Sequence, residues 1–149
     1  IPVDSAAIQQ IRPLRQVNVL DQAHTYEHSL EVHLPFLQVV LADFKIVPLV
    51  VGDASDEEVT EVIEALWHGG ETRFVISSDL SHYHDYATAR ELDAATARAI
   101  ESLKPQDIGK NQACGCTPIR GLLQAARRHG FRARTVRRLR ISTHRTTVR

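Results

Sequence analysis

A chain of 149 residues with 43% hydrophobic and 24% charged side chains has the composition of one ordinary globular domain, which excludes a peptide or a disordered tail. Its longest apolar run, 46–51, is too short to cross a bilayer, so we expect no membrane span. Cys114 and Cys116 are too close together for a framework disulfide, and this cysteine usage favours a cytoplasmic location.

The net charge of zero hides an uneven distribution. Residues 1–107 contain all 18 acidic residues, whereas residues 108–149 contain 11 basic residues and no acidic one. These arginines could neutralise nucleic-acid phosphates, but they alternate with Val, Leu, Ile and Thr instead of the aromatics that stack on bases. We expect no nucleic-acid partner, and interpret residues 135–149 as a solvated end or an atypical end produced by truncation or a frame error. The absence of methionine leads us to expect that the natural start is missing as well.

The first predicted element is a helix over about 27–43. Apolar residues recur there at spacings of three and four, which is typical of one face of an amphipathic helix. Pro35 lies inside this range, so the helix either kinks there or begins there. The β-branched run 45–51 then predicts a buried strand that ends at Gly52.

Further helices and a second strand follow. Ser55 and Glu58 have the spacing of a capping box, which predicts a helix to about Trp67. Residues 72–77 predict a strand, and the alanine-rich stretch 86–103 predicts a helix.

The last predicted helix starts with Thr117 as its cap and Pro118 in its first turn, and it closes near Gly130. Alternating strands and helices indicate an α/β domain with a mostly parallel sheet. In such sheets, ligand sites form beyond the carboxyl ends of the strands, which is where the loop 77–83 falls.

Histidines are numerous in this chain and cluster in two places. Of eight histidines, His28 belongs to one group and His82 to another. Histidine serves as a metal ligand or a general base because its imidazole exchanges a proton near neutral pH. His28 shares a helix face with Glu31, although an exposed histidine that only caps or solvates the helix start explains this spacing as well.

The stretch 77–83 combines hydroxyls, a carboxylate and a histidine in one loop. Asp79 could orient His82 and raise its basicity, or Asp79 or Ser81 could simply cap the next helix. Cys114 precedes a predicted helix N-terminus, where a thiolate is stabilised and can bind a metal or react. A Cys-x-Cys pair alone is a poor match to structural zinc sites.

Four motifs in this chain resemble those of the Memo family, which includes the B protein of the AmmeMemoRadiSam system. The motifs are EHSLEVHLPFL at 27–37, IVPLVVG at 46–52, SSDLSHY at 77–83, and Cys114-Gly115 with Pro118-Ile119. The resemblance implies a three-layer α/β/α fold like that of class III extradiol dioxygenases, with a mostly parallel sheet and a pocket for one iron or copper ion. It also implies that Cys114 is a metal ligand, that His82 is the catalytic acid or base, and that Asp79 and His28 lie in the same pocket.

The resemblance is limited to the C-terminal half of the family's sequences. Two further metal-binding histidines, in Pro-His-Ala-Gly and Ser-His-His type motifs, are absent from this chain. We therefore expect residues 1–134 to be the C-terminal part of a Memo-like domain and the chain alone to be inactive.

Two functions are compatible with these motifs. The first is a metal-dependent redox role on an unknown small substrate in the complete protein. The alternative is a non-catalytic module that binds a peptide or protein in the former active-site cleft. The resemblance also implies the AMMECR-like and radical-SAM proteins of the same system as partners, and an open sheet edge would allow a homo-oligomer.

Overall fold

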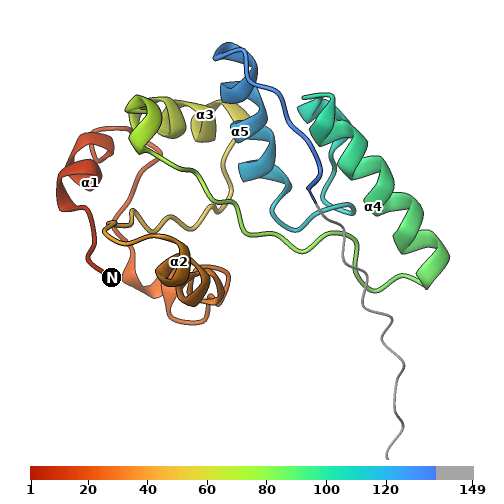
Figure 1. The fold of residues 1–149 in the computed structure, drawn as a ribbon, viewed down its shortest axis with the longest axis horizontal. Coiled ribbons are helices and arrows are strands. Elements are labelled where there is room, and N and C mark those ends of the chain that lie inside the picture. Colours follow the sequence, from red (N-terminus) through yellow and green to blue (C-terminus); the bar gives the residue numbers. More distant parts are fainter. Residues whose placement is uncertain (137–149) are drawn as a thin grey trace, which may run out of the picture.

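The computed structural model describes residues 1–136, and the regular structure in this range is helical (Figure 1). The α-helices are α1 (Ser5–Ile11), α2 (Leu34–Val40), α3 (Asp56–Ala65), α4 (Tyr86–Glu101) and α5 (Cys116–Arg128). Short 3-10 turns lie at η1 (Asp21–His24), η2 (Glu31–His33), η3 (Gly69–Glu71) and η4 (Pro105–Asp107). The atypical end expected at 135–149 falls outside the described residues except for its first two positions.

The predicted three-layer α/β/α fold with a mostly parallel sheet is wrong for residues 1–136. The two expected strands, 45–51 and 72–77, run extended, and the β pairing between described residues is one isolated parallel bridge from Val3 to Ile46. β-branched residues favour a strand only where a neighbouring strand and a packed face exist. Parallel sheets are covered on both faces, whereas Leu49 is 47% exposed and Val75 is 53% exposed.

Helix α3 begins as the sequence predicts, at a capping box. The Ser55 hydroxyl accepts a hydrogen bond from the Glu58 amide at 3.2 Å, and the Glu58 carboxylate accepts one from the Ser55 amide at 2.9 Å. Together these bonds satisfy two amides that a helix start would otherwise leave free. The Ser55 amide and hydroxyl both donate to the Glu58 carboxylate, at 2.9 and 3.1 Å, and these hydrogen bonds lower the pKa of Glu58.

The closest packing between helices joins α3 to α5. Gly121 of α5 lies so near α3 that a Cβ there would come within 2.5 Å of the Val59 side chain. Beside this contact the fully buried Thr60 hydroxyl lies 2.7 Å from the Asp56 carbonyl and 3.1 Å from the Gly121 carbonyl. Glycine at position 121 therefore lets the two helix backbones approach closely enough for Thr60 to bridge them.

Ion pairs between α3 and α5 give a structural reason for the uneven charge distribution. Asp56 binds Arg120 at 2.7 Å, and Glu64 binds His129 at 2.8 Å and Arg128 at 3.8 Å. The hydrogen bond that the Arg120 guanidinium donates to the Asp56 carboxylate is the main reason that the pKa of Arg120 is raised. Acidic residues of the first 107 positions thus meet basic residues of the remainder, although partly exposed pairs contribute only about 0–1 kcal/mol each.

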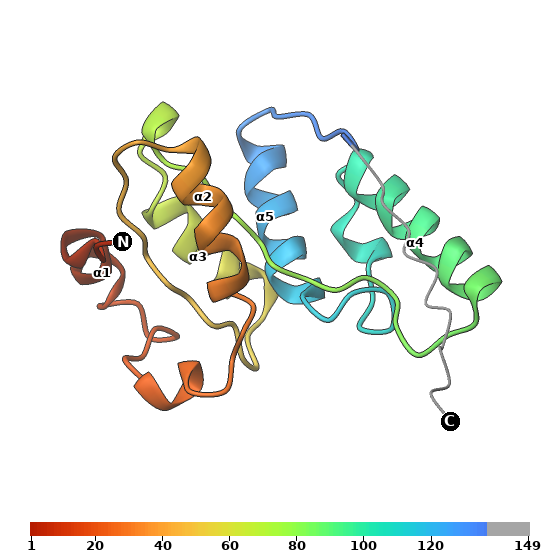
Figure 2. The same ribbon diagram turned by 60° about the horizontal axis from the view of Figure 1, so that its bottom comes forward.

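On its other side, α5 packs toward α4, so that α5 lies between α3 and α4 (Figures 1 and 2). A cluster of small and branched apolar side chains fills this space through η4 and the loop that follows it. Its buried members are Ala99, Ile108, Ala113, Cys116 and Leu123. Cys116 is therefore a core residue, with only 2% of its surface exposed.

The predicted start of α4 is confirmed, whereas the predicted N-cap of α5 is wrong. The helix expected at 86–103 is confirmed as α4, with Asp85 as its N-cap. Hydrogen bonds from Thr88 are the main reason that the pKa of Asp85 is lowered. Helix α5 starts at Cys116 with Gly115 as its N-cap, so the prediction of Thr117 as the cap is wrong.

The helix expected over 27–43 is much shorter than predicted. It consists of the 3-10 turn η2 followed by α2, and Pro35 lies in the first turn of α2. Proline fits there because the first amides of a helix have no carbonyl partner within the helix, so the lack of an amide hydrogen costs no hydrogen bond. Several apolar side chains of α2 face outward, with Phe36 at 74% and Val39 at 84% exposure. Within residues 1–136, no helix has both the length and the apolar character that a bilayer span requires.

Substituting Gly121 tests the close approach of α3 and α5. Alanine is about 1 kcal/mol better than glycine in a helix interior, but a Cβ within 2.5 Å of the branched Val59 side chain costs about 2–3 kcal/mol, the upper part of the usual range for overpacking. We expect Gly121→Ala to lower the free energy of unfolding by about 1–2 kcal/mol in urea denaturation. Gly52→Ala, where no atom lies within 4 Å of the new Cβ, is the matched control and should leave stability nearly unchanged. Equal or greater stability of Gly121→Ala would contradict this packing.

Candidate functional site

The segment 77–79 lies against residues 114 and 115, at the start of α5. The Cys114 amide donates to the Asp79 carbonyl at 3.1 Å, and the Asp79 amide donates to the Cys114 sulfur at 3.2 Å. These two bonds run in opposite directions between the same residues, so they fix the position of the sulfur relative to the segment. Cys114 is nonetheless exposed, and a molecule in solution can reach its thiol.

Ser78 and Gly115 complete this contact. The Gly115 amide donates to the Ser78 hydroxyl oxygen at 2.9 Å, and that oxygen lies 3.7 Å from the Cys114 sulfur. A Cβ at position 115 would lie 2.8 Å from the Ser78 Cβ and 2.9 Å from the Ser77 carbonyl. Only glycine leaves room for the serine residues at this distance, so Gly115 is a steric requirement of the site.

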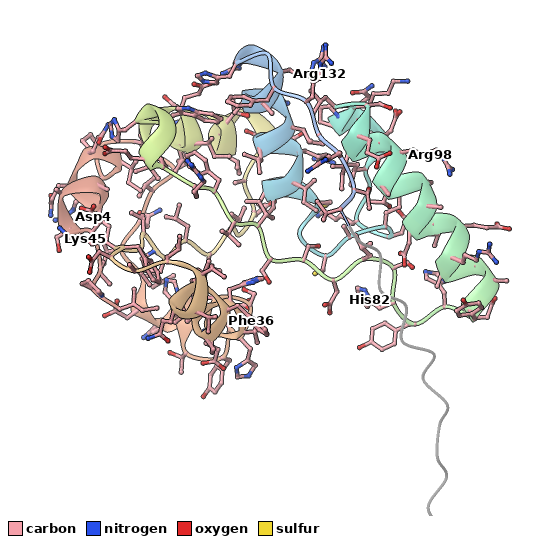
Figure 3. The ribbon with its side chains drawn as sticks, in the orientation of Figure 1. Asp4, Phe36, Lys45, His82, Arg98 and Arg132 are labelled. Atoms are coloured by element: carbon pink, nitrogen blue, oxygen red, sulfur yellow. The ribbon has the colours of Figure 1, made fainter. Side chains whose placement is uncertain are left out.

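His82 lies three positions beyond Asp79, on the exposed loop that leads to α4 (Figure 3). Its Nδ1 lies 2.9 Å from the Leu80 carbonyl oxygen. Because a carbonyl can only accept, Nδ1 must carry the hydrogen, and in the neutral ring Nε2 then has a free lone pair. The His82 ring also contacts the Tyr83 ring edge to face, with centroids 4.9 Å apart. The arrangement leaves Nε2 as the nitrogen available to accept a proton or bind a ligand.

His28 does not join this group in the described structure. Its Nδ1 pairs with the Glu31 carboxylate at 2.8 Å, and both side chains are largely exposed. The segment 21–33, which carries His28, lies with α2 on the left of Figures 1 and 2, while the loop to α4 lies on the right. The structure therefore brings Cys114 and Asp79 together, places His82 on the adjoining loop, and leaves His28 apart.

A metal ion of the kind that the resemblance implies does not fit the described residues alone. Among residues 1–136, no group of three or more His, Cys, Asp or Glu side chains lies close enough to hold a metal ion. The nearest partners of the Cys114 sulfur are a backbone amide and a serine hydroxyl, and an amide N–H donates instead of coordinating. Protein centres for redox metals commonly use about three protein ligands. The described residues therefore supply the Cys114 sulfur but no complete set of metal ligands.

Two residues that shape the site had no role predicted from the sequence. Gly115 could have been suspected, because glycine is the residue that permits the closest backbone approach. Asp93 gave no signal, because it lies within an alanine-rich helical stretch, 12 positions after the Ser81 that it binds.

These features define a helical domain whose exposed cysteine is held by a Ser-Ser-Asp segment. The whole chain, residues 1–149, matches the sequence model of the family described as Memo-like protein. A MEMO1 family protein from Aeropyrum pernix is 35% identical over 128 residues, which cover 78% of this chain and 46% of that protein. One from Sulfolobus acidocaldarius is 31% identical over 139 residues, covering 85% of this chain and 49% of the relative. The chain belongs to the Memo-like family.

The relatives are longer than the present chain. A MEMO1 family protein from Archaeoglobus fulgidus is 42% identical over 86 residues, which cover 54% of this chain and 33% of that protein. The chain spans about half the length of the curated relatives that it matches. No solved structure matches the chain.

Substituting Gly115 tests the steric requirement at the site. We expect Gly115→Ala to push the segment 77–79 away and to weaken the hydrogen bond from the Asp79 amide to sulfur, because the new Cβ would collide with Ser78. In a ¹⁵N-labelled chain, the Asp79 and Cys114 amide resonances should shift far more than those of α3. Gly70→Ala, which meets nothing within 4 Å, is the control. Unchanged Asp79 and Cys114 resonances in Gly115→Ala would contradict the contact.

Proposed function

We propose that this protein is a Memo-like redox protein that acts on a small substrate, and that the segment 77–83 and Cys114 form one wall of its substrate site. The observation that carries the proposal is the pair of opposed hydrogen bonds between Asp79 and Cys114, at 3.1 and 3.2 Å. They hold a sulfur atom in a fixed place while leaving it exposed. A buried structural cysteine would instead resemble Cys116.

Each side chain in this wall has a distinct chemical role in the proposal. The Cys114 sulfur acts as a ligand or nucleophile, because sulfur is both soft and polarizable. His82 moves a proton through Nε2, since its Nδ1 is occupied by the Leu80 carbonyl. The exposed Asp79 carboxylate, on a residue three positions before His82 that is bound through its backbone to Cys114, attracts donor or cationic groups of the substrate.

Iron or copper enters this proposal through Cys114 alone. Its sulfur would be one ligand of the ion, and the remaining ligands would come from residues other than those described. A single sulfur gives only weak affinity, because most coordination positions then remain with water. The proposal places this chemistry in the cytoplasm, where an exposed thiol such as Cys114 stays reduced.

Titration with Co²⁺ under anaerobic conditions tests whether the Cys114 sulfur is available to a metal. We expect the chain to show a weak sulfur-to-cobalt charge-transfer absorption that saturates only at high Co²⁺ and disappears after dialysis. Cys114→Ser should abolish this absorption. Cys116→Ser is the matched control, and should retain it because Cys116 is buried in the core.

Two results would contradict the proposal. One is the absence of any sulfur-to-cobalt absorption in the unmodified chain, and the other is its loss in Cys116→Ser but not in Cys114→Ser. Either result would remove the redox role from Cys114 and favour the alternative of a peptide- or protein-binding module.

A further inference from the structure

Asp93 of α4 binds the loop that carries His82. One oxygen of its carboxylate accepts hydrogen bonds from both the Ser81 amide, at 3.0 Å, and the Ser81 hydroxyl, at 2.7 Å. The Ser81 hydroxyl oxygen also lies 3.3 Å from the Ala89 carbonyl of the same helix. Hydrogen bonds to a charged carboxylate are stronger than those between neutral groups, so Ser81 is firmly attached to the middle of α4.

The same loop is attached to α4 a second time, at Asp85. The Asp85 carboxylate accepts from the Ala87 and Thr88 amides, at 2.9 and 3.0 Å, and from the Thr88 hydroxyl at 2.6 Å. Only residues 82–84 lie between the two attachments. Tyr83, in the middle, has a φ of 63°, a conformation that residues other than glycine rarely adopt. The loop is therefore short and constrained at both ends.

His82 is the first residue after the Asp93 attachment, and its ring depends on that attachment. Its Nδ1 donates to the carbonyl of Leu80, the residue just before Ser81. The Leu80 carbonyl and the Ser81 amide belong to one peptide plane, so the bond from that amide to Asp93 sets the direction of the carbonyl. Asp93 thus determines whether the Leu80 oxygen faces the His82 ring.

We propose that Asp93 is a positioning residue for His82: it orients the Leu80–Ser81 peptide so that Nδ1 keeps its hydrogen and Nε2 stays free. This proposal rests on the proposed function in one respect only, which is that the proposed function uses the free Nε2 to move a proton. Asp93 acts on His82 through Ser81.

The protonated nitrogen of His82 can be read directly by long-range ¹H–¹⁵N NMR on the full chain labelled at histidine. The signals are assigned by their loss in His82→Gln and recorded at alkaline pH, where imidazoles are neutral. We expect the Nδ1–H form to be the major one in the unmodified chain. In Asp93→Ala it should become the minor form, because a ring without a partner favours the Nε2–H form.

Two further variants separate positioning from a general effect on folding. Asp93→Asn keeps one acceptor oxygen, and should retain an Nδ1–H population between those of the unmodified chain and Asp93→Ala. Glu91→Ala removes an acidic side chain from the exposed side of the same helix and should leave the His82 signals unchanged. If Asp93→Ala fails to fold, as judged by the amide spectrum of α3 and α5, Asp93→Asn alone decides. An Nδ1–H population of His82 in Asp93→Asn equal to that in the unmodified chain then overturns the proposal.

The proposal is also overturned if His82 is already in the Nε2–H form in the unmodified chain, or if Asp93→Ala leaves the Nδ1–H form in the majority. The NMR measurement needs neither a metal nor a substrate. Failure of the Co²⁺ titration at Cys114 together with a clear tautomer change in Asp93→Ala would therefore discard the proposed function and keep the positioning role.

Discussion

The packing of α5 against α3 is the interaction on which the candidate site depends. Gly121 permits the close approach, the buried Thr60 hydroxyl bridges the two backbones, and Asp56 pairs with Arg120 at 2.7 Å. Once α5 is fixed in this way, its first residues occupy a defined place on the path of the extended segment that follows α3. The sulfur of Cys114 is held where the segment 77–79 meets the start of α5. The packing between the middle parts of α3 and α5 therefore determines where the reactive group lies.

The candidate site is a loop held between two helices. On one side, Ser78 and Asp79 bind the start of α5, and on the other, Ser81 is bound to Asp93 of α4. Such double attachment gives a loop the defined geometry that chemistry requires, although loops in general are mobile. The exposed residues His82 and Cys114 are therefore presented from fixed backbone without being part of the core. The two helices that flank α5 contribute in different ways, since α3 fixes its position and α4 orients the loop.

Local signals in the sequence predicted α3, α4, α5 and part of α2, but they could not predict the pairing of extended segments. The Ser55 capping box and the helix start at Pro35 depend on neighbouring residues, so their patterns predicted the structure. A strand depends on a partner that can lie anywhere in the chain, and 45–51 and 72–77 have the right composition without partner strands among residues 1–136. For the same reason the motif 77–83 was recognised, whereas Asp93 was not: its role arises only when α4 folds beside the loop.

The central claim is that Ser78 lies beside Cys114, and disulfide trapping tests it most directly. In a Cys116→Ala background, Ser78→Cys should form a disulfide with Cys114 under mild oxidation. The Ser78 hydroxyl oxygen lies 3.7 Å from the Cys114 sulfur, so a sulfur at position 78 would be close enough to bond. Peptide mapping by mass spectrometry would identify the linked peptides. Ser29→Cys, on the segment that leads into α2, is the control and should remain unlinked. Rapid linkage at position 78 is the predicted result, and no linkage there, or equal linkage at position 29, would contradict the account.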